Sequence, residues 1–528
     1  MNRPEPPRVG FPPPKPPPRP TEGSAATATT REFVRGSSLL LFGRIVSVLL
    51  NLAVQVLTVR HLAVAEYGAF AYALGVASIG SSMILLGLGK ALPRFVPMYH
   101  ERGETGRAFG TIVLAVGTVV GLGLAVVLLL HGLRGVIEGT LVTDPLSLSV
   151  LLILIALTPL HALDTLLQKL AAVFIGARAI FFRRHVVGPG LKLAAVLLVM
   201  LVAGDAHLLA YGYVIGGLIG VWLYVAILIR DWRQKGLLQY LRPKRLIVPV
   251  REIYTFSIPL VTADFPGLVR GSVAVLLLEY FHTTTAVAGY RAVLPIAGVN
   301  LVASEAFAFL FVPLASRMYA RKQSEDISDL YWRTATWISV LSFPVFAVSV
   351  TMAEPLAVVL FGEEYAGSGT LLALLAVGHF VYASMGYNAK TLTVYGRVRF
   401  LVASDLLAAG FGIGLGFLLI PAYGPLGAAI AVTMLMIFQA LFKHLGLWWT
   451  GTGVRLIDFR FVRVHCVIFV LLAGLIALQQ VVSLSLYQGV ALVGVISLLL
   501  LRLTHRFIGI HETFPELSRI PLVRWILG

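Results

Sequence analysis

The sequence predicts an all-α integral membrane protein with about fourteen transmembrane helices, arranged as two parallel six-helix repeats plus two C-terminal helices. Three observations lead to this fold class. Of the 528 residues, 58% are hydrophobic and only 13% are charged, whereas ordinary globular chains are roughly 25% charged. The apolar residues gather in runs of about 20, the length that crosses a bilayer. The gaps between successive apolar runs are alternately rich and poor in lysine and arginine.

Basic residues occur mainly in every second gap between the apolar runs. Counted together with the ends of the adjoining spans, the even-numbered gaps and the two tails hold 36 of the 42 lysines and arginines, and the odd-numbered gaps hold Arg60, Arg134 and Arg291. Loops rich in lysine and arginine resist translocation and stay cytoplasmic. With an even number of spans, both termini are then expected in the cytoplasm.

Fourteen apolar runs are long enough, or nearly so, to span a bilayer as helices. The expected spans are residues 36–59, 67–89, 109–131, 147–168, 186–203, 207–229, 254–279, 289–313, 334–353, 367–388, 399–420, 424–447, 464–483 and 485–502. No gap between them is long enough for a folded soluble domain.

Short motifs recur in the same order in the two halves, each at the corresponding helix. They are Arg31-Glu32-Phe33 with Arg251-Glu252-Ile253, Phe95-Val96-Pro97 with Phe311-Val312-Pro313, Gly176 with Gly396, and Ala210-Tyr211-Gly212 with Ala422-Tyr423-Gly424. Six spans per repeat make the halves parallel, and substrate sites of such transporters lie between the halves.

The chain is therefore expected to divide into six segments. These are a disordered Pro-rich cytoplasmic tail (1–30), an N-terminal transmembrane lobe (31–230), a basic cytoplasmic linker (231–252), a C-terminal lobe (253–448), two further helices (449–503) and a cytoplasmic tail (504–528).

The first span carries a polar stripe. Arg44, Ser47, Asn51, Gln55 and Thr58 are spaced by three or four residues, so a helix presents them on one face. Polar residues at membrane depth avoid lipid. The stripe therefore lines either a helix–helix interface or a water-filled cavity, and its length and its cation favour the cavity.

The seventh span contains Pro259, Asp264, Pro266 and Arg270. Broken helices are tolerated where they line a cavity or are buried in protein. Asp264 and Arg270 form either a structural ion pair or part of a substrate site. The candidate substrate-binding residues are Arg44, Asn51, Gln55, Arg270 and Arg291, and the candidate ion-coupling residues are Asp264, Glu305 and Asp405.

Several classes of function are disfavoured by the sequence. It lacks a phosphate-binding loop, an Asp-x-Asp pair and a His-Glu-x-x-His motif, so we expect neither an enzyme nor a cofactor or a metal site. The net charge of +17 could indicate a nucleic-acid partner. Because the basic residues form short segments between spans, they instead fit anionic lipid headgroups, and no nucleic-acid partner is expected.

The chain resembles the polysaccharide transport family of the multidrug/oligosaccharidyl-lipid/polysaccharide exporter superfamily. The resemblance covers roughly residues 31–500 and is carried by short motifs in order. These are Arg35-Gly36-Ser37, Glu66-Tyr67-Gly68, Leu86-Gly87-Leu88-Gly89 with Arg94, Phe256-Ser257-Ile258-Pro259, Leu360-Phe361-Gly362 with Tyr365, Gly396-Arg397, and Ile420-Pro421-Ala422-Tyr423-Gly424 with Gly427-Ala428-Ala429.

The resemblance implies two helical lobes around a central cavity. It also implies flipping of undecaprenyl-pyrophosphate-linked oligosaccharides across the bacterial inner membrane during polysaccharide biosynthesis. The expected partners are this lipid-linked substrate, membrane lipids and other polysaccharide assembly proteins. Two alternatives stay open, an ion-coupled multidrug exporter and a flippase for the peptidoglycan lipid precursor. A membrane enzyme of glycan assembly is disfavoured by the missing motifs.

Overall fold

The described part of the chain is helical and forms a multi-pass membrane protein. A computed structural model describes residue 43 and residues 46–138, 144–175, 183–242, 245–385, 387–482 and 484–508. The predicted tail 1–30, most of the predicted tail 504–528, and Arg44 lie outside these residues.

The first half consists of helices that match the first six predicted spans. They are the first helix (Val46–His61), then α2 (Val64–Ile84), α3 (Leu88–Glu101), α4 (Thr105–Gly132), α5 (Arg134–Ile137), α6 (Pro145–Leu154), α7 (Leu157–Phe174), the π-helical turn η1 (Arg183–Val187), α9 (Gly188–Leu201) and α10 (Ala206–Gln234).

The second half repeats this pattern and ends in two further helices. A 3-10 turn, η2 (Leu237–Leu241), leads to α11 (Val250–Ser257), η4 (Ile258–Asp264), α12 (Phe265–Leu268), η5 (Val269–Val273), α13 (Ala274–Phe281), α14 (Thr284–Gly298), α15 (Leu301–Ala320), α16 (Ser324–Thr351), α17 (Ala353–Phe361), η6 (Glu363–Ser368), α18 (Gly369–Ser384), α19 (Asn388–Val394) and α20 (Val398–Trp449). The last helices are α21 (Phe459–Val481) and α22 (Leu486–Ile508).

Among the described residues, eleven helical stretches are long and apolar enough to cross a membrane. One of them, α20, joins two helices across a kink at Gly424, whose φ is 54°. The first helix is shorter over its described residues. The all-helical membrane class is confirmed, whereas the number fourteen and the domain boundaries stay predictions.

Aspartates begin several of these helices. The Asp144 carboxylate accepts the N–H groups of Leu146 and Ser147 at the start of α6, and Pro145 occupies the first helical position. Asp205 accepts the Leu208 N–H at the start of α10. Such caps satisfy backbone donors that have no partner inside the helix. They fix where the spans begin after the turns.

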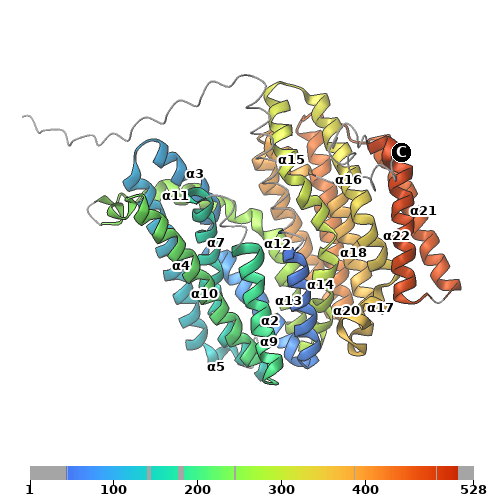
Figure 1. Ribbon diagram of the computed structural model, residues 1–528, viewed down its shortest axis with the longest axis horizontal. Coiled ribbons are helices and arrows are strands. Elements are labelled where there is room, and N and C mark those ends of the chain that lie inside the picture. The colour runs from blue at the N-terminus through green and yellow to red at the C-terminus, as the bar shows by residue number, and fades with distance from the viewer. Residues whose placement is uncertain are drawn as a thin grey trace, which may run out of the picture.

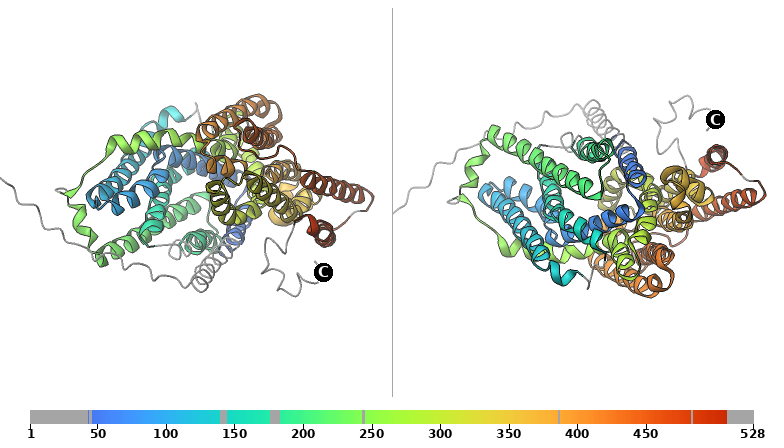
Figure 2. Two further views of the ribbon diagram at one scale, coloured as in Figure 1. Left: turned by 90° about the horizontal axis from the view of Figure 1, so that it is seen from above. Right: turned by 90° about the horizontal axis from the view of Figure 1, so that it is seen from below.

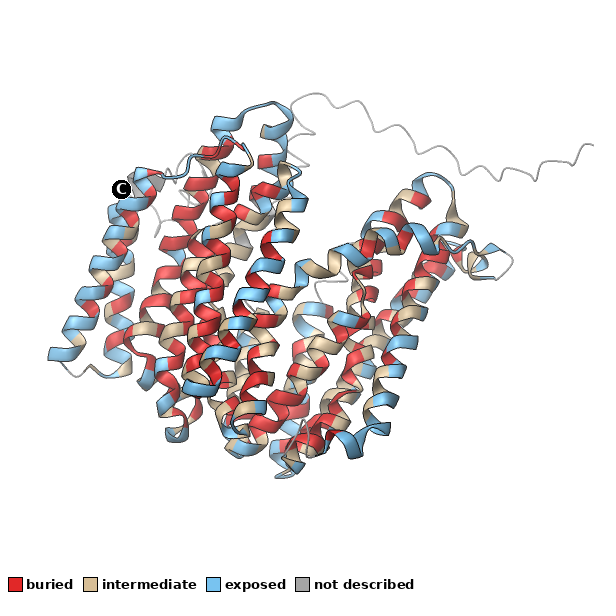
Figure 3. Ribbon diagram, turned by 180° about the vertical axis from the view of Figure 1, so that it is seen from behind, coloured by how far each residue is buried: buried red, intermediate tan, exposed pale blue. Residues whose placement is uncertain are grey.

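Two lobes meet at one end of the molecule and diverge toward the other (Figures 1 and 3). The N-lobe runs from the first helix to α10, and the C-lobe from α12 to α20. The views along the vertical axis of Figure 1 also show the lobes side by side, with α21 and α22 beyond the C-lobe (Figure 2), where both pack on α16.

The diverging end carries the basic connections. The turn from α3 to α4 holds Arg102, the first turn of α4 holds Arg107, and the turn from α15 to α16 holds Arg321 and Lys322. We call this the basic end and the other the joint end. The basic end is the side that the alternation of basic residues predicts to be cytoplasmic.

At the joint end a single apolar cluster crosses from one lobe to the other. It includes Val54, Ala73 and Leu151 of the N-lobe together with Val275 and Val287 of the C-lobe, all buried. The backbones also come very close, because a Cβ added at Gly68 would lie 2.0 Å from the Thr284 carbonyl oxygen. In this conformation the lobes are therefore closed at the joint end.

The seventh span begins on one lobe and ends on the other. Its first helix, α11, packs on α3 and α4, whereas α12 and α13 pack on α20. The Tyr99 hydroxyl donates to Glu252 at 2.7 Å, and Lys90 lies 2.9 Å from Asp264. After Ser257 the span passes through the 3-10 turn η4, which contains Pro259, then through α12, which contains Pro266, and the π-helical turn η5.

Candidate functional site

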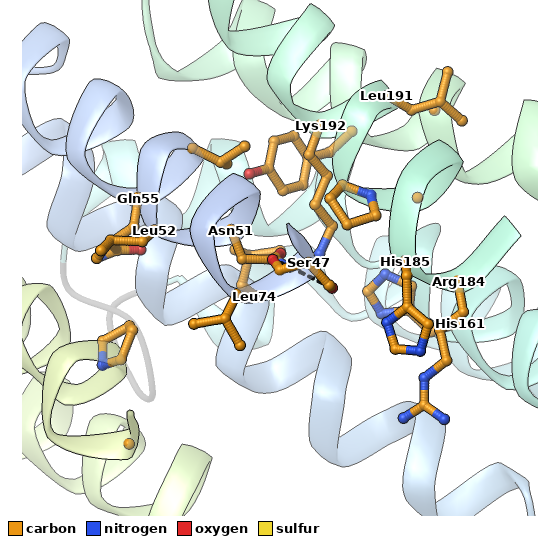
Figure 4. Close-up of a pocket in the computed structure, with 18 of the residues that line it drawn as sticks. Ser47, Asn51, Leu52, Gln55, Leu74, His161, Arg184, His185, Leu191 and Lys192 are labelled. Carbon is orange, nitrogen blue, oxygen red and sulfur yellow. Dashed lines mark hydrogen bonds between the residues drawn. The ribbon is translucent and has the colours of Figure 1, made fainter. Parts of the chain in front are cut away.

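A cavity of about 700 Å³ lies between the lobes. Its N-lobe walls come from the first helix, α7, η1, α9 and α10, and its C-lobe wall comes from α14 and α15. The N-lobe side chains that enter it are drawn in Figure 4. The cavity lies where a site between two repeats is expected.

The first helix places its polar stripe on this cavity. Ser47, Asn51 and Gln55 are lining residues, one helical turn apart. The Asn51 amide donates to the Ser47 carbonyl oxygen at 2.7 Å and to the Ser47 hydroxyl at 3.3 Å, beside the cavity (Figure 4). Thr58 is buried and donates back to Val54. The cavity therefore receives the middle of the stripe.

Gln55 lies at the closed end of the cavity. Its amide nitrogen lies 2.6 Å from the Tyr67 hydroxyl and 3.4 Å from the Ala292 carbonyl oxygen of α14. Arg291, also on α14, lines the cavity and donates from Nη1 to the Gly271 carbonyl at 2.9 Å. Gly271 belongs to a π-helical turn, whose irregular ladder frees carbonyl groups. The hydrogen bond to Gly271 therefore holds Arg291, one of the cations of the cavity, in place.

Positive charge predominates on the cavity wall. The lining includes four basic side chains, Arg183, Arg184, Lys192 and Arg291, against two carboxylates, Asp164 and Glu305, and also His161 and His185. Lys192, His161 and His185 project into one region of the cavity opposite the first helix (Figure 4). Such a wall favours an anionic occupant.

One of these charges is neutralised by its neighbour. Arg183 Nη2 lies 2.7 Å from Asp164 Oδ1, and Arg183 is buried. Gly220 makes room for the guanidinium, since a Cβ there would lie 1.9 Å from Nη2. Arg183 therefore positions Asp164 and the turn that carries Arg184. Lys192, at the next turn of α9, has its ammonium 5.8 Å from the Tyr213 ring centre.

Arg270 is placed differently from the prediction. It is not among the described lining residues of the cavity. Its Nη1 donates to Gln439 Oε1 at 2.6 Å, and its guanidinium lies 5.1 Å from the Tyr382 ring centre. Of the two alternatives left open for Asp264 and Arg270, the ion pair between them does not form, because Asp264 pairs with Lys90 on α3. Arg270 belongs to the interior of the C-lobe.

Asp405 belongs to the same interior network. Lys443 Nζ lies 2.6 Å from Asp405 Oδ1, and Gln439 Nε2 donates to that oxygen at 3.0 Å. The Asp405 and Lys443 side chains are 9% and 5% exposed. A coupling cation at Asp405 would therefore have to displace an ammonium that the chain itself supplies.

The sequence argument missed most of the N-lobe cations. Arg183 and Arg184 lie between the fourth and fifth predicted spans, in a gap that the charge pattern assigns to the cytoplasm, and Lys192 lies near the cytoplasmic end of the fifth span, where a lysine ordinarily extends to the membrane surface. One feature of the sequence could have indicated these cations. Arg183, Arg184 and His185 form a basic cluster at the start of the fifth span, about two helical turns before Lys192. Arg44 lies outside the described residues. The roles of the other predicted site residues stay predictions.

Comparison with known proteins identifies the family. The sequence profile of a family described as polysaccharide biosynthesis protein matches residues 33–308, more than half of the chain. The chain belongs to this family. Its curated relatives include a capsular polysaccharide biosynthesis protein, CapF, of Staphylococcus aureus, which is 22% identical over 199 residues, 38% of this chain and 50% of the relative.

A second curated relative is an uncharacterized membrane protein of Methanocaldococcus jannaschii. It is 22% identical over 291 residues, 51% of this chain and 54% of the relative. The matched region thus spans about half the length of each curated relative.

Solved structures show the same fold. The lipid II flippase MurJ in an inward closed conformation has a TM-score of 0.64 at 11% identity, over 91% of this chain and 100% of that one. An inward-facing multidrug resistance transporter of the MATE family has a TM-score of 0.59 at 13% identity, over 76% and 93%. At these identities the neighbours show the fold alone and nothing about the substrate.

Proposed function

We propose that the protein flips an undecaprenyl-pyrophosphate-linked oligosaccharide across the bacterial inner membrane during polysaccharide biosynthesis. The observation that carries the proposal is the excess of cations on a cavity that lies between two lobes. A pyrophosphate headgroup is anionic, and arginine and lysine bind phosphate through charge-assisted hydrogen bonds. Family membership supports a substrate from glycan assembly.

The cavity residues divide between two parts of such a substrate. Arg184 and Lys192 would hold the pyrophosphate near the basic end, where the substrate enters from the cytoplasm. The Asn51 amide and Ser47 hydroxyl would contact the sugar. The prenyl tail would stay in the lipid between the lobes. No metal or nucleotide takes part, and other assembly proteins would deliver and receive the substrate.

The substrate would cross the membrane when the protein changes which end of its cavity is closed. The joint end is closed in the described structure, so the cavity belongs to the basic end. Rocking of the two lobes would close the basic end and open the joint end. The MATE structures support this scheme, because inward-facing and outward-facing conformations are known for that fold.

The test is transbilayer movement in proteoliposomes that contain a fluorescent polyprenyl-pyrophosphate-linked sugar, scored by its accessibility to a membrane-impermeant reagent. Lys192→Gln is expected to lower movement roughly tenfold to 100-fold, because one hydrogen bond to a charged group is worth about 1.5–3 kcal/mol. The matched control is Arg230→Gln, an exposed cation on α10 away from the cavity lining. Equal movement in both variants would refute a cationic phosphate site.

A flippase for the peptidoglycan lipid precursor is the second candidate, because that substrate also carries a pyrophosphate and the MurJ fold covers most of the chain. Depletion in the native host separates the two, since loss of the precursor flippase stops growth. A multidrug exporter is disfavoured by the cationic wall, which repels cationic drugs.

A further inference from the structure

A carboxyl group lies buried in the joint between the lobes. Glu279 is on α13, two residues before that helix ends at Phe281, and the residue is only 8% exposed. Ser147, on α6 of the N-lobe, donates its hydroxyl to Glu279 Oε1 at 2.8 Å. The other oxygen, Oε2, is buried without a hydrogen-bond partner among the described residues.

Glu279 differs in its lack of a cation from three other carboxylates at membrane depth. Asp164, Asp264 and Asp405 contact Arg183, Lys90 and Lys443, respectively. Within the described part of the chain, Glu279 makes no ion pair, and its recorded polar contact is the one with Ser147. The charge of an ionised Glu279 would therefore be uncompensated.

The groups that face Glu279 from the neighbouring elements do not supply the missing charge. Tyr72 of α2 and Asp144 at the start of α6 lie within electrostatic range, and neither is cationic. Three cations on elements that pack against α13 contact other groups instead. Arg291 of α14 bonds to Gly271, Arg270 of η5 to Gln439, and Lys443 of α20 to Asp405. His282, the next titratable group along the chain, contacts the Ile420 carbonyl.

An ionised carboxylate at this place would be costly. Burial of a charge without a partner costs several kcal/mol, whereas an unpaired neutral group costs about 1–3 kcal/mol. Burial therefore favours the neutral form while the joint is closed. Separation of the lobes would part Glu279 from Ser147, because they belong to different lobes. Water would then reach the carboxyl group and let it ionise.

We propose that Glu279 is a proton-binding site of the joint: closing the joint end binds a proton at Glu279, and opening it releases the proton to the compartment on that side. A rise in the pH of that compartment then favours the open joint. One proton per closure changes the ratio of open to closed molecules by at most about tenfold per pH unit. The proposal assumes nothing about the transported substrate.

The experiment measures the opening of the joint end directly. Spin labels are attached to cysteines that replace Leu133 of the N-lobe end and Tyr487 at the start of α22, which are 42% and 81% exposed. Cys466, the single cysteine of the chain, is replaced by serine. Pulsed electron paramagnetic resonance then gives the distance between the labels in substrate-free protein from about pH 5 to about pH 8.

The longer distance is expected to gain population as the pH rises. Glu279→Gln keeps the shape of the neutral carboxyl group and the bond to Ser147. It is expected to stay closed at every pH, and Asp144→Asn, a neighbouring carboxylate, is expected to keep the response. No response in the parent protein, or the same response in Glu279→Gln, would overturn the proposal.

A second variant decides the matter even if Glu279→Gln does not accumulate. Ser147→Ala removes a hydrogen bond that exists only while the joint is closed, so opening becomes easier and its midpoint is expected to move to lower pH. An unmoved midpoint counts against Glu279. A failed flippase assay with an intact pH response would refute the proposed substrate and leave this site standing.

Discussion

The network around Asp405 gives the sharpest test of the C-lobe, because it separates a structural ion pair from an ion-coupling site. Asp405 and Lys443 are 2.6 Å apart and almost fully buried. Breaking a buried ion pair by removing one partner costs about 3–5 kcal/mol. Lys443→Met would leave the Asp405 charge with the Gln439 amide as its remaining donor, so we expect a loss of about 3 kcal/mol.

The double variant shows whether Asp405 and Lys443 stabilise each other. Asp405→Asn together with Lys443→Met removes both charges and keeps the side-chain volumes close to the originals. We therefore expect the double variant to be more stable than Lys443→Met alone. The interaction energy from the double-mutant cycle should be about 1–3 kcal/mol.

The assay is unfolding of the purified protein in mixed micelles with increasing dodecyl sulfate, followed by tryptophan fluorescence. Each variant is compared with the parent at the same detergent composition. Additive effects of the two changes, or a loss below about 1 kcal/mol for Lys443→Met, would refute a structural pair. Stabilisation of Lys443→Met by sodium ions would show that the site can accept an external cation after all.

Three further outcomes are expected at other positions. Gly68→Ala should lower transport without lowering protein abundance, because its Cβ would collide with the Thr284 carbonyl when the joint closes; wild-type transport would contradict this close approach. Arg60→Gln should increase spin-label distances across the joint end, since Arg60 donates to the Leu360 carbonyl at 2.9 Å, and unchanged distances would exclude a latch. Asp458→Ala should destabilise the protein by about 1 kcal/mol in the unfolding assay through loss of an N-cap, and the absence of any shift would show that the end of α21 frays without cost.

Hydropathy and helical periodicity were sufficient to predict an all-helical membrane protein. Spans are long and apolar because the bilayer requires it, so each span can be recognised from its own consecutive residues. The stripe of Ser47, Asn51 and Gln55 could likewise be placed on the cavity, since polar residues three to four positions apart share a helix face. Both predictions depend on neighbours along the chain.

Partners far apart in the sequence could not be predicted in this way. Arg270 has the features of a cavity cation, and its bond to Gln439 joins residues 169 positions apart. Nothing along the chain marks Glu279, because a single carboxyl group near the end of a span is ordinarily expected to face water. Its hydrogen-bond partner, Ser147, lies 132 positions earlier. Packing between lobes decides such cases, and periodicity contains no information about it.

The attachment of α11 to the N-lobe and of α13 to the C-lobe has a mechanical consequence. A relative rotation of the lobes must bend or twist the stretch Ile258–Val273, which holds the 3-10 and π-helical turns. Such turns have poorer hydrogen-bond geometry than an α-helix and deform more readily. Elastic strain would thus accumulate in this stretch, and lengthening the chain before α11 would not relieve it. The deformable stretch Ile258–Val273 therefore couples the movements of the two lobes.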